Sequence, residues 1–127
     1  AAAVALGEKA ALLAGELGAK ACFLGSTDLT HYGPGYGFTP RGTGPGSVEW
    51  VRGENDRRII DRFLGVQPEE VIQEALSRRN ACCPGAAAAA LAACRQEGSS
   101  RGFLVDYATS HDIAPDVNFV GYAGVVC

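Results

Sequence analysis

The chain has 127 residues, of which 47% are hydrophobic and 20% charged, and its formal net charge is -3. This length and composition predict one globular domain, residues 1–127, and argue against a disordered chain. A small negative charge gives no electrostatic reason to expect nucleic acid or an anionic membrane as partner, and no apolar run reaches membrane-spanning length. The pairs Arg57-Arg58 and Arg78-Arg79 are interpreted as solvated helix faces.

The first third of the chain predicts a helix, a strand and a long loop. Apolar residues at helical spacing over residues 3–17 indicate the helix, and Gly18 is typical of a helix end. The apolar run over residues 20–25 then predicts a short buried strand. The glycine- and proline-rich stretch from Ser26 to Gly46 predicts a loop.

The rest of the chain predicts three helices and two strands. The helices are expected over residues 48–64, 67–79 and 84–98, and the strands over residues 102–110 and 118–127. This order indicates an α/β domain with helices packed on a mixed sheet. Three strands are few for a sheet flanked by four helices, and the chain contains no methionine. We therefore expect an incomplete domain whose N-terminal portion is missing.

The cysteines indicate a reducing compartment. The chain has five cysteines, an odd number, and no secretory signal pattern accompanies them. The expected location is therefore the cytoplasm, with reduced thiols. No C-x-x-C pair occurs, which excludes a zinc ribbon or a thioredoxin-type motif on spacing. Cys22 in its strand and Cys94 in its helix are interpreted as core residues.

The stretch "STDLTHYGPGYG" places an acid and a histidine just beyond the predicted strand. A triad of Ser26, Asp28 and His31 is disfavoured, because such triads bring residues together from distant segments. Ligand sites in open α/β sheets lie outside the carboxyl ends of strands, where His31 could act as a general acid or base. Asp28 could fix the tautomer of His31 or cap the turn. The alternative is a histidine exposed in a loop.

Two further stretches carry candidate side chains. Cys82 and Cys83 directly precede a predicted helix, where a thiolate has a lowered pKa and is a competent nucleophile or metal ligand. The alternative is a pair of small structural cysteines. In "DYATSHD", His111 follows a strand end as His31 does, but a solvated turn explains this stretch equally well.

In order and spacing, the motifs of this chain resemble the C-terminal half of the MEMO family, whose microbial members are named AmmeMemoRadiSam system protein B. The motifs are "STDLTHYGPGYGF", the pair Asn55-Asp56, "ACCPGAAAAAL", "YATSHDIAPD" and "FVGYAGVV". The family pattern reads roughly S-S-D-L-S-H-Y, N-D, C-G-P-G-A, Y-x-x-S-G-D and V-G-Y-A. The match runs from about Leu6 to Val126. Cys83 and His111 each stand where the pattern has glycine.

The resemblance implies a LigB-like fold, as in class III extradiol dioxygenases, with a non-haem metal at the strand ends. Cys82 matches the cysteine metal ligand of the family, and His31 matches an acid/base histidine beside the metal, with Asp28 behind it. Two ligand histidines of the family, in Pro-His-Ala-Gly-like and Gly-Pro-Ser-His-like motifs, have no counterpart in this chain. The metal would be Fe(II) or copper, with zinc also suited, bound in the full-length protein.

Three functions follow as alternatives. The first is a metal-dependent redox or dioxygenase-like protein that takes a small-molecule or peptide ligand. The second is a non-catalytic adaptor that holds peptides in the same pocket, as the resemblance also implies. The third is an enzyme with Cys82 as nucleophile and His31 as base. In each case the expected partner is the missing N-terminal half of the same domain, and neither nucleic acid nor membrane is expected.

Overall fold

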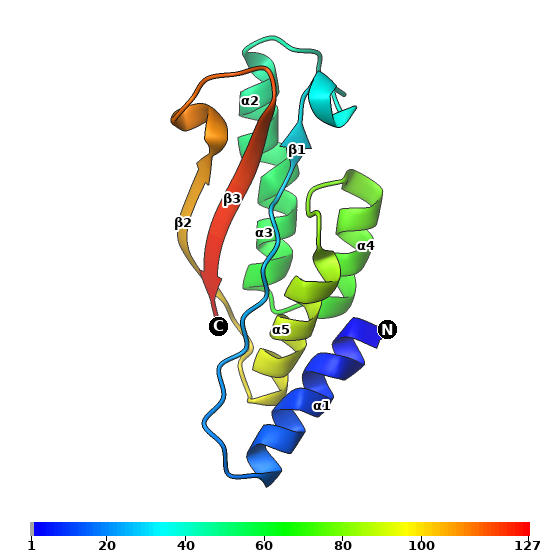
Figure 1. Ribbon diagram of the computed structural model, residues 1–127, viewed down its shortest axis with the longest axis vertical. Helices are drawn as coiled ribbons and strands as arrows, with labels where there is room; N and C mark the ends of the chain where they lie inside the picture. Colours follow the sequence, from blue (N-terminus) through cyan, green and yellow to red (C-terminus); the bar gives the residue numbers. More distant parts are fainter. Residues whose placement is uncertain (1) are drawn as a thin grey trace.

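The structure is a computed structural model that describes residues 2–127 (Figure 1). The helices are α1 (Ala2–Glu16), α2 (Gly46–Trp50), α3 (Asp56–Leu64), α4 (Pro68–Arg78) and α5 (Pro84–Gln96), and the strands are β1 (His31–Tyr32), β2 (Phe103–Thr109) and β3 (Phe119–Val126). The predicted helices and both C-terminal strands are confirmed, with ends that differ by a few residues. No helix within residues 2–127 combines the length and the apolar character needed to cross a membrane.

The three strands form one sheet in the order β1-β3-β2. Both pairs are antiparallel: His31 lies opposite Val120, and Thr109 lies opposite Gly121. The strands lie to one side of α3 and α5, and α1 packs against α5 (Figure 1). The α/β class is therefore confirmed, although the strand pairs within residues 2–127 include no parallel pair of the kind a mixed sheet requires.

Helices α1 and α5 approach each other closely because small residues line their contact. A side chain at Gly7 would clash with the backbone carbonyl of Ala89. Ala11 of α1 and Ala88 and Ala92 of α5 are fully buried in this region. The alanine-rich helix thus packs against another helix, as its composition allows.

The helix expected over residues 48–64 forms, with one irregularity. Residues Val51–Asn55 make a π-helical turn (η2) between α2 and α3, and this turn contains Gly53. Asn55 and Asp56, at the end of the turn, are buried. π-turns inside α-helices are frequently found at functional sites, and this one brings two polar side chains into the interior.

The buried strand expected over residues 20–25 is wrong. The segment belongs to no strand, and the side chain of Leu24 is 92% exposed. A strand needs a neighbour for its backbone groups, and pairing with β3 begins only where the Leu29 N–H donates to the Gly121 carbonyl.

The interpretation of Cys22 and Cys94 as core residues is also wrong. Cys22 is exposed, because the segment that carries it is not covered by a neighbouring strand. Cys94 forms a disulfide with Cys127, because α5 brings it beside the end of β3. The expectation that all five cysteines are reduced is corrected for this pair, and Cys22, Cys82 and Cys83 are free thiols.

Candidate functional site

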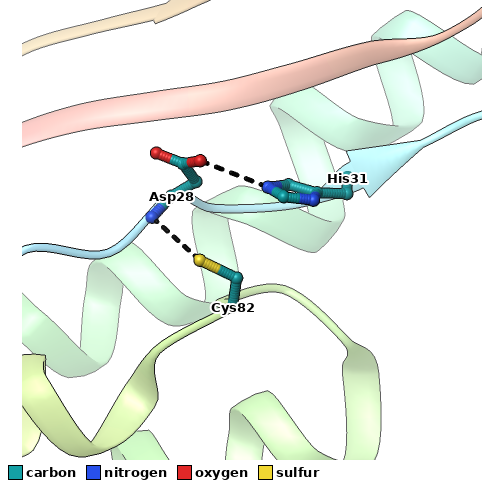
Figure 2. Close-up of side chains that lie close together, drawn as sticks. All are labelled: Asp28, His31 and Cys82. Atoms are coloured by element: carbon teal, nitrogen blue, oxygen red, sulfur yellow. Dashed lines mark hydrogen bonds and ion pairs between the residues drawn. The ribbon is translucent and has the colours of Figure 1, made fainter. Parts of the chain in front are cut away.

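Three of the predicted side chains converge at the start of β1. Asp28 comes from the extended segment that leads into β1, His31 is the first residue of β1, and Cys82 comes from the loop between α4 and α5 (Figure 2). His31 Nε2 lies 3.3 Å from Asp28 Oδ2. The Asp28 N–H donates to Cys82 Sγ at 3.4 Å. One potential ligand atom from each side chain lies within 4.8 Å of the other two.

Backbone hydrogen bonds join the two segments that carry this group. The Cys82 N–H donates to the Asp28 carbonyl at 3.0 Å, and the Cys83 N–H donates to Thr27 Oγ1 at 2.9 Å. Both amides of the cysteine pair are therefore fixed against the segment before β1. Because these bonds set the direction of the loop, the thiol of Cys82 is turned toward Asp28 and His31.

The second cysteine differs from the first in its surroundings. Cys83 belongs to no group of three potential metal ligands within residues 2–127. A hydrogen bond to Cys82 and the charge of Cys82 raise the pKa of the Cys83 thiol, and Asp28 adds a smaller effect in the same direction. Of the two cysteines, Cys82 is the one that lies beside the histidine.

A pocket of about 270 Å³ opens beside His31 and Cys82. Its wall combines apolar side chains with an imidazole, a guanidinium and a thiol. The lining residues are Leu29, His31, Ala75, Leu76, Arg79, Ala81 and Cys82. Leu76 is 76% exposed at this wall, so the pocket has room for a ligand with apolar surface.

Arg79 fixes the glycine-rich loop beside the pocket. It donates hydrogen bonds to the carbonyls of Tyr36 and Gly37, both at 3.2 Å, and its guanidinium lies 4.7 Å from the ring centre of Phe38. The Tyr36 ring in turn packs on His31, with 4.9 Å between ring centres. Arg79 is exposed, as expected of a solvated residue, but it lies at the end of α4 in the left-handed conformation, with φ 54°, rather than within the helix.

Behind β1, a buried set of hydrogen bonds surrounds Asp56. Its Oδ1 accepts from the N–H and the hydroxyl of Thr30, at 3.0 and 2.5 Å, and its Oδ2 accepts from the Tyr107 hydroxyl at 2.8 Å. Asn55 Nδ2 donates to Thr30 Oγ1 at 3.0 Å. Burial raises the pKa of Asp56, and burial together with the nearby Asp56 raises the pKa of Tyr107. These bonds fix Thr30, the residue next to His31.

The buried set extends to the loop that carries Cys82. Asn80 Nδ2 donates to the Asn55 carbonyl at 2.8 Å and lies 3.4 Å from Glu74 Oε1. Arg58 pairs with Glu74 through two hydrogen bonds, at 2.7 and 3.1 Å, and this pairing lowers the pKa of Glu74. Both segments of the site are therefore held by one interior network.

The sequence identified Asn55-Asp56 as a motif but assigned these residues no role, and it did not identify Thr30, Asn80 and Tyr107. The helical spacing around Asn55 could have indicated that this residue is buried. Val51, Asn55 and Ile59 follow each other at a spacing of one helical turn, and all three are buried. A polar residue in a buried helical position needs an interior partner, and that partner could not be named from sequence.

The stretch around His111 forms a turn, in line with the solvated-turn interpretation. Residues Ser110–Asp112 make a short 3-10 turn (η3). Ser110 Oγ accepts from the Val120 N–H at 3.0 Å, and Asp112 accepts from the Thr109 N–H at 2.7 Å and pairs with Arg52. The Thr109 N–H and Arg52 lower the pKa of Asp112. His111 is not a member of the ligand group formed by Asp28, His31 and Cys82.

Comparisons with known proteins give a consistent result. A family model described as Memo-like protein matches residues 2–126. The MEMO1 family protein of Methanosarcina acetivorans is 35% identical over 127 residues, which cover 98% of this chain and 42% of that protein. Its counterpart in Methanosarcina barkeri is 32% identical over 97% of this chain and 42% of its own length, and that of Thermococcus onnurineus is 30% identical over 89% and 40%. The chain thus spans about two-fifths of these relatives. No solved structure matches it.

Proposed function

Because the chain belongs to the Memo-like protein family, we propose that it is part of a metal-dependent redox protein, dioxygenase-like in chemistry, with its metal in the pocket beside His31. The observation that carries this proposal is the convergence of a carboxylate, an imidazole and a thiol within 4.8 Å. As a working location we propose the cytoplasm, where a free thiol such as Cys82 stays reduced and where the Cys94–Cys127 disulfide would be open.

The donor set at the site fits a transition metal. A thiolate and an imidazole are ligands that iron, copper and zinc accept, and a carboxylate adds a harder donor. Asp28 and His31 are half-exposed and Cys82 is exposed, so all three are open to an arriving ion. Cys82 would hold the metal, which we propose to be Fe(II) or copper, with zinc suited to the same donors. An iron or copper ion bound there would supply one-electron redox chemistry.

His31 would hold or move a proton beside that metal. If its Nε2–H donates to Asp28, its Nδ1 carries the lone pair and is the basic nitrogen. Asp28 would then fix both the tautomer and the orientation of the ring. A histidine held in this way can take a proton from a bound ligand and return it near neutral pH. The proposed roles are therefore acid/base for His31 and positioning for Asp28.

The ligand would be a small molecule or a peptide side chain that enters the pocket between Leu76 and Arg79. Apolar surface on one wall and a guanidinium on another favour a ligand with an apolar body and a polar end. The chain spans 42% of the Methanosarcina acetivorans relative, so further metal ligands and part of the pocket would come from outside residues 1–127.

The second candidate function is a non-catalytic adaptor that binds a peptide in this pocket. The exposed side chain of Leu76 favours it, because an apolar residue at the rim of an open pocket is a typical anchor for a peptide side chain. An adaptor needs neither a metal nor oxygen.

Metal content and oxygen use distinguish the two functions. A full-length polypeptide that contains residues 1–127 is dialysed without oxygen against Fe(II) or Cu(I), its metal is measured by elemental analysis, and oxygen uptake is followed after air is admitted. The metal-dependent function predicts bound metal that is lost in Cys82→Ala and kept in Cys83→Ala, together with oxygen uptake. Equal metal content in both variants would refute the ligand role of Cys82. Bound peptide without metal or oxygen uptake would favour the adaptor.

A further inference from the structure

The pocket beside His31 and Cys82 has a positively charged wall. Of the residues that line it, Arg79 alone carries a permanent charge. The chain as a whole has a formal net charge of -3, so the sign of the charge at this wall is opposite to that of the protein. A pocket of this kind attracts a ligand that carries a negative charge.

Arg79 has no carboxylate partner within residues 2–127. It takes part in none of the ion pairs formed there, although most of the other arginines do. Its side chain is exposed, so water can solvate the guanidinium until a ligand replaces that water. The positive charge at the pocket wall is therefore available to an anion that comes from outside these residues.

The hydrogen bonds of Arg79 leave one edge of its guanidinium free. Nη1 donates to the Gly37 carbonyl and Nη2 donates to the Tyr36 carbonyl, both at 3.2 Å. A guanidinium has further N–H groups, which these two bonds do not use. Arg58 shows what the edge with Nε and Nη2 can bind, because with it Arg58 donates to both carboxylate oxygens of Glu74. The same edge of Arg79 can take a carboxylate in the same way.

The surroundings of Arg79 hold the guanidinium in place before a ligand arrives. The two carbonyls of the loop after β1 bind one edge of it, and its Cζ lies 4.7 Å from the ring centre of Phe38. An arginine side chain that is already fixed loses little further conformational freedom on binding, which favours affinity.

The rest of the pocket suits an apolar body. Leu29, Ala75, Leu76 and Ala81 share the lining with Arg79, and Leu76 is 76% exposed there. The volume of about 270 Å³ admits a small molecule or the end of a peptide. A ligand that matches both parts of the wall has an apolar body and one negatively charged group.

We propose that Arg79 determines the specificity of this pocket by binding the carboxylate of a ligand with an apolar body. The planar carboxylate presents two oxygens, which match two parallel N–H groups of the free guanidinium edge. This inference rests on the proposed function in one respect, namely that the pocket beside His31 is the ligand site. It does not require a metal at Cys82.

Phenylacetate and its neutral amide, phenylacetamide, test this role of Arg79, because they share a ring and differ in charge. A full-length polypeptide that contains residues 1–127 is freed of metal, and each probe is titrated while amide chemical shifts are followed. Phenylacetate binds roughly tenfold more tightly than phenylacetamide, since hydrogen bonds to charged groups are the stronger ones. Added salt reduces this preference.

Substitutions at two adjacent arginines sharpen the test. Arg79→Gln lowers the preference for phenylacetate to less than about twofold, and Arg79→Lys keeps part of it, because an ammonium group retains the charge without the paired donors. Arg78→Gln removes the same charge from an exposed side chain that does not line the pocket, and it keeps the preference. A merely structural role of Arg79 would weaken the binding of both probes alike.

A short peptide that ends in phenylalanine with a free carboxylate distinguishes the two sources of this group. Tighter binding of the peptide than of phenylacetate would identify a peptide end as the ligand, and weaker binding would identify a small acid. Both results retain the carboxylate as the group that Arg79 binds.

Three results would overturn the proposal. They are equal affinity of the wild type for phenylacetate and phenylacetamide, a preference that persists in Arg79→Gln, and a preference that Arg78→Gln removes as completely as Arg79→Gln does. Because the titrations use metal-free protein, Cys82→Ala keeps the preference. Failure of this proposal is therefore distinguishable from failure of the metal proposal.

Discussion

The segment 28–32 has an inner and an outer side that are built in opposite ways. On the inner side, Thr30 is fully buried, and its N–H and hydroxyl are both bonded to Asp56. On the outer side, Asp28 and His31 are half-exposed and touch each other through one 3.3 Å contact. Neighbouring residues of one short segment thus differ in whether their polar atoms are fully hydrogen-bonded within the protein or remain open to a ligand.

This difference separates positioning from chemistry. Buried polar groups that are all paired have one arrangement of low energy, so they fix the backbone on which His31 is carried. Polar groups at the surface keep free lone pairs and can accept a ligand or a proton. We therefore expect substitutions on the inner side to change stability, and substitutions on the outer side to change binding.

Asp56→Ala should have the largest effect. It leaves the Thr30 N–H, the Thr30 hydroxyl and the Tyr107 hydroxyl buried without an acceptor, and each such group costs about 1–3 kcal/mol. We expect the free energy of unfolding in urea to fall by about 3 kcal/mol or more. The matched variant Asp28→Ala, on the outer side, should change it by less than about 1 kcal/mol. Equal losses in the two variants would remove the distinction between the sides.

Tyr107→Phe removes one hydrogen bond of the inner side while keeping the ring. The Asp56 carboxylate loses a donor at 2.8 Å, and we expect a loss of about 1–2 kcal/mol in the free energy of unfolding. Tyr122→Phe is the control, because Tyr122 is 44% exposed and its hydroxyl has no hydrogen bond within residues 2–127. The free energy of unfolding of Tyr122→Phe should change by no more than about 0.5 kcal/mol. A similar loss in both variants would show that removal of any tyrosine hydroxyl explains the effect.

Stability should depend on pH through Asp56. Burial raises its pKa in the folded state, so between the pKa of an ordinary aspartate and this raised value the folded state binds more protons than the unfolded state. The contribution of Asp56 is therefore fully present below the ordinary pKa and is lost as pH rises through the raised one. Unfolding curves of the wild type and Asp56→Asn, compared at each pH, should show this slope only in the wild type. Parallel curves would contradict it.

Arg79 offers the smallest effect on stability. Arg79→Gly removes the hydrogen bonds to Tyr36 and Gly37, but it also relieves a left-handed conformation that costs a non-glycine residue about 1 kcal/mol. We expect the free energy of unfolding to change by less than about 1 kcal/mol, while amides of the loop after β1 exchange faster. Arg79→Ala loses the same bonds without the relief, so it should be less stable than Arg79→Gly. The reverse order would show that strain at this residue is unimportant.

Local patterns predicted much of the fold. Apolar spacing and end signals located α1, the α2–α3 helix, α4 and α5, and β-prone runs located β2 and β3. The side chains of the outer side, Asp28, His31 and Cys82, were also predicted from sequence, because each is a reactive residue type at the end of a predicted element. That they lie together was implied by the resemblance to the MEMO family.

The failures share a physical cause, which is dependence on contacts between distant segments. Whether residues 20–25 pair as a strand depends on a neighbour, and the disulfide depends on α5 lying beside the end of β3. Thr30 forms hydrogen bonds with Asn55 and Asp56, which lie 25 and 26 residues further along the chain, and only the fold shows these contacts. The carbonyl partners of the Arg79 side chain lie 42 and 43 residues away, in the loop after β1, and no local signal contains them.

The central claim is that Cys82, and not Cys83, is the metal-binding thiol of the outer side. Cobalt(II) tests it directly, because a bound thiolate gives a charge-transfer absorption band that water, carboxylate and imidazole do not. A full-length polypeptide that contains residues 1–127 is titrated with cobalt(II) as wild type, Cys82→Ser and Cys83→Ser. The account predicts the band in the wild type and in Cys83→Ser and its loss in Cys82→Ser. A band that persists in Cys82→Ser, or none in the wild type at millimolar cobalt, would contradict it.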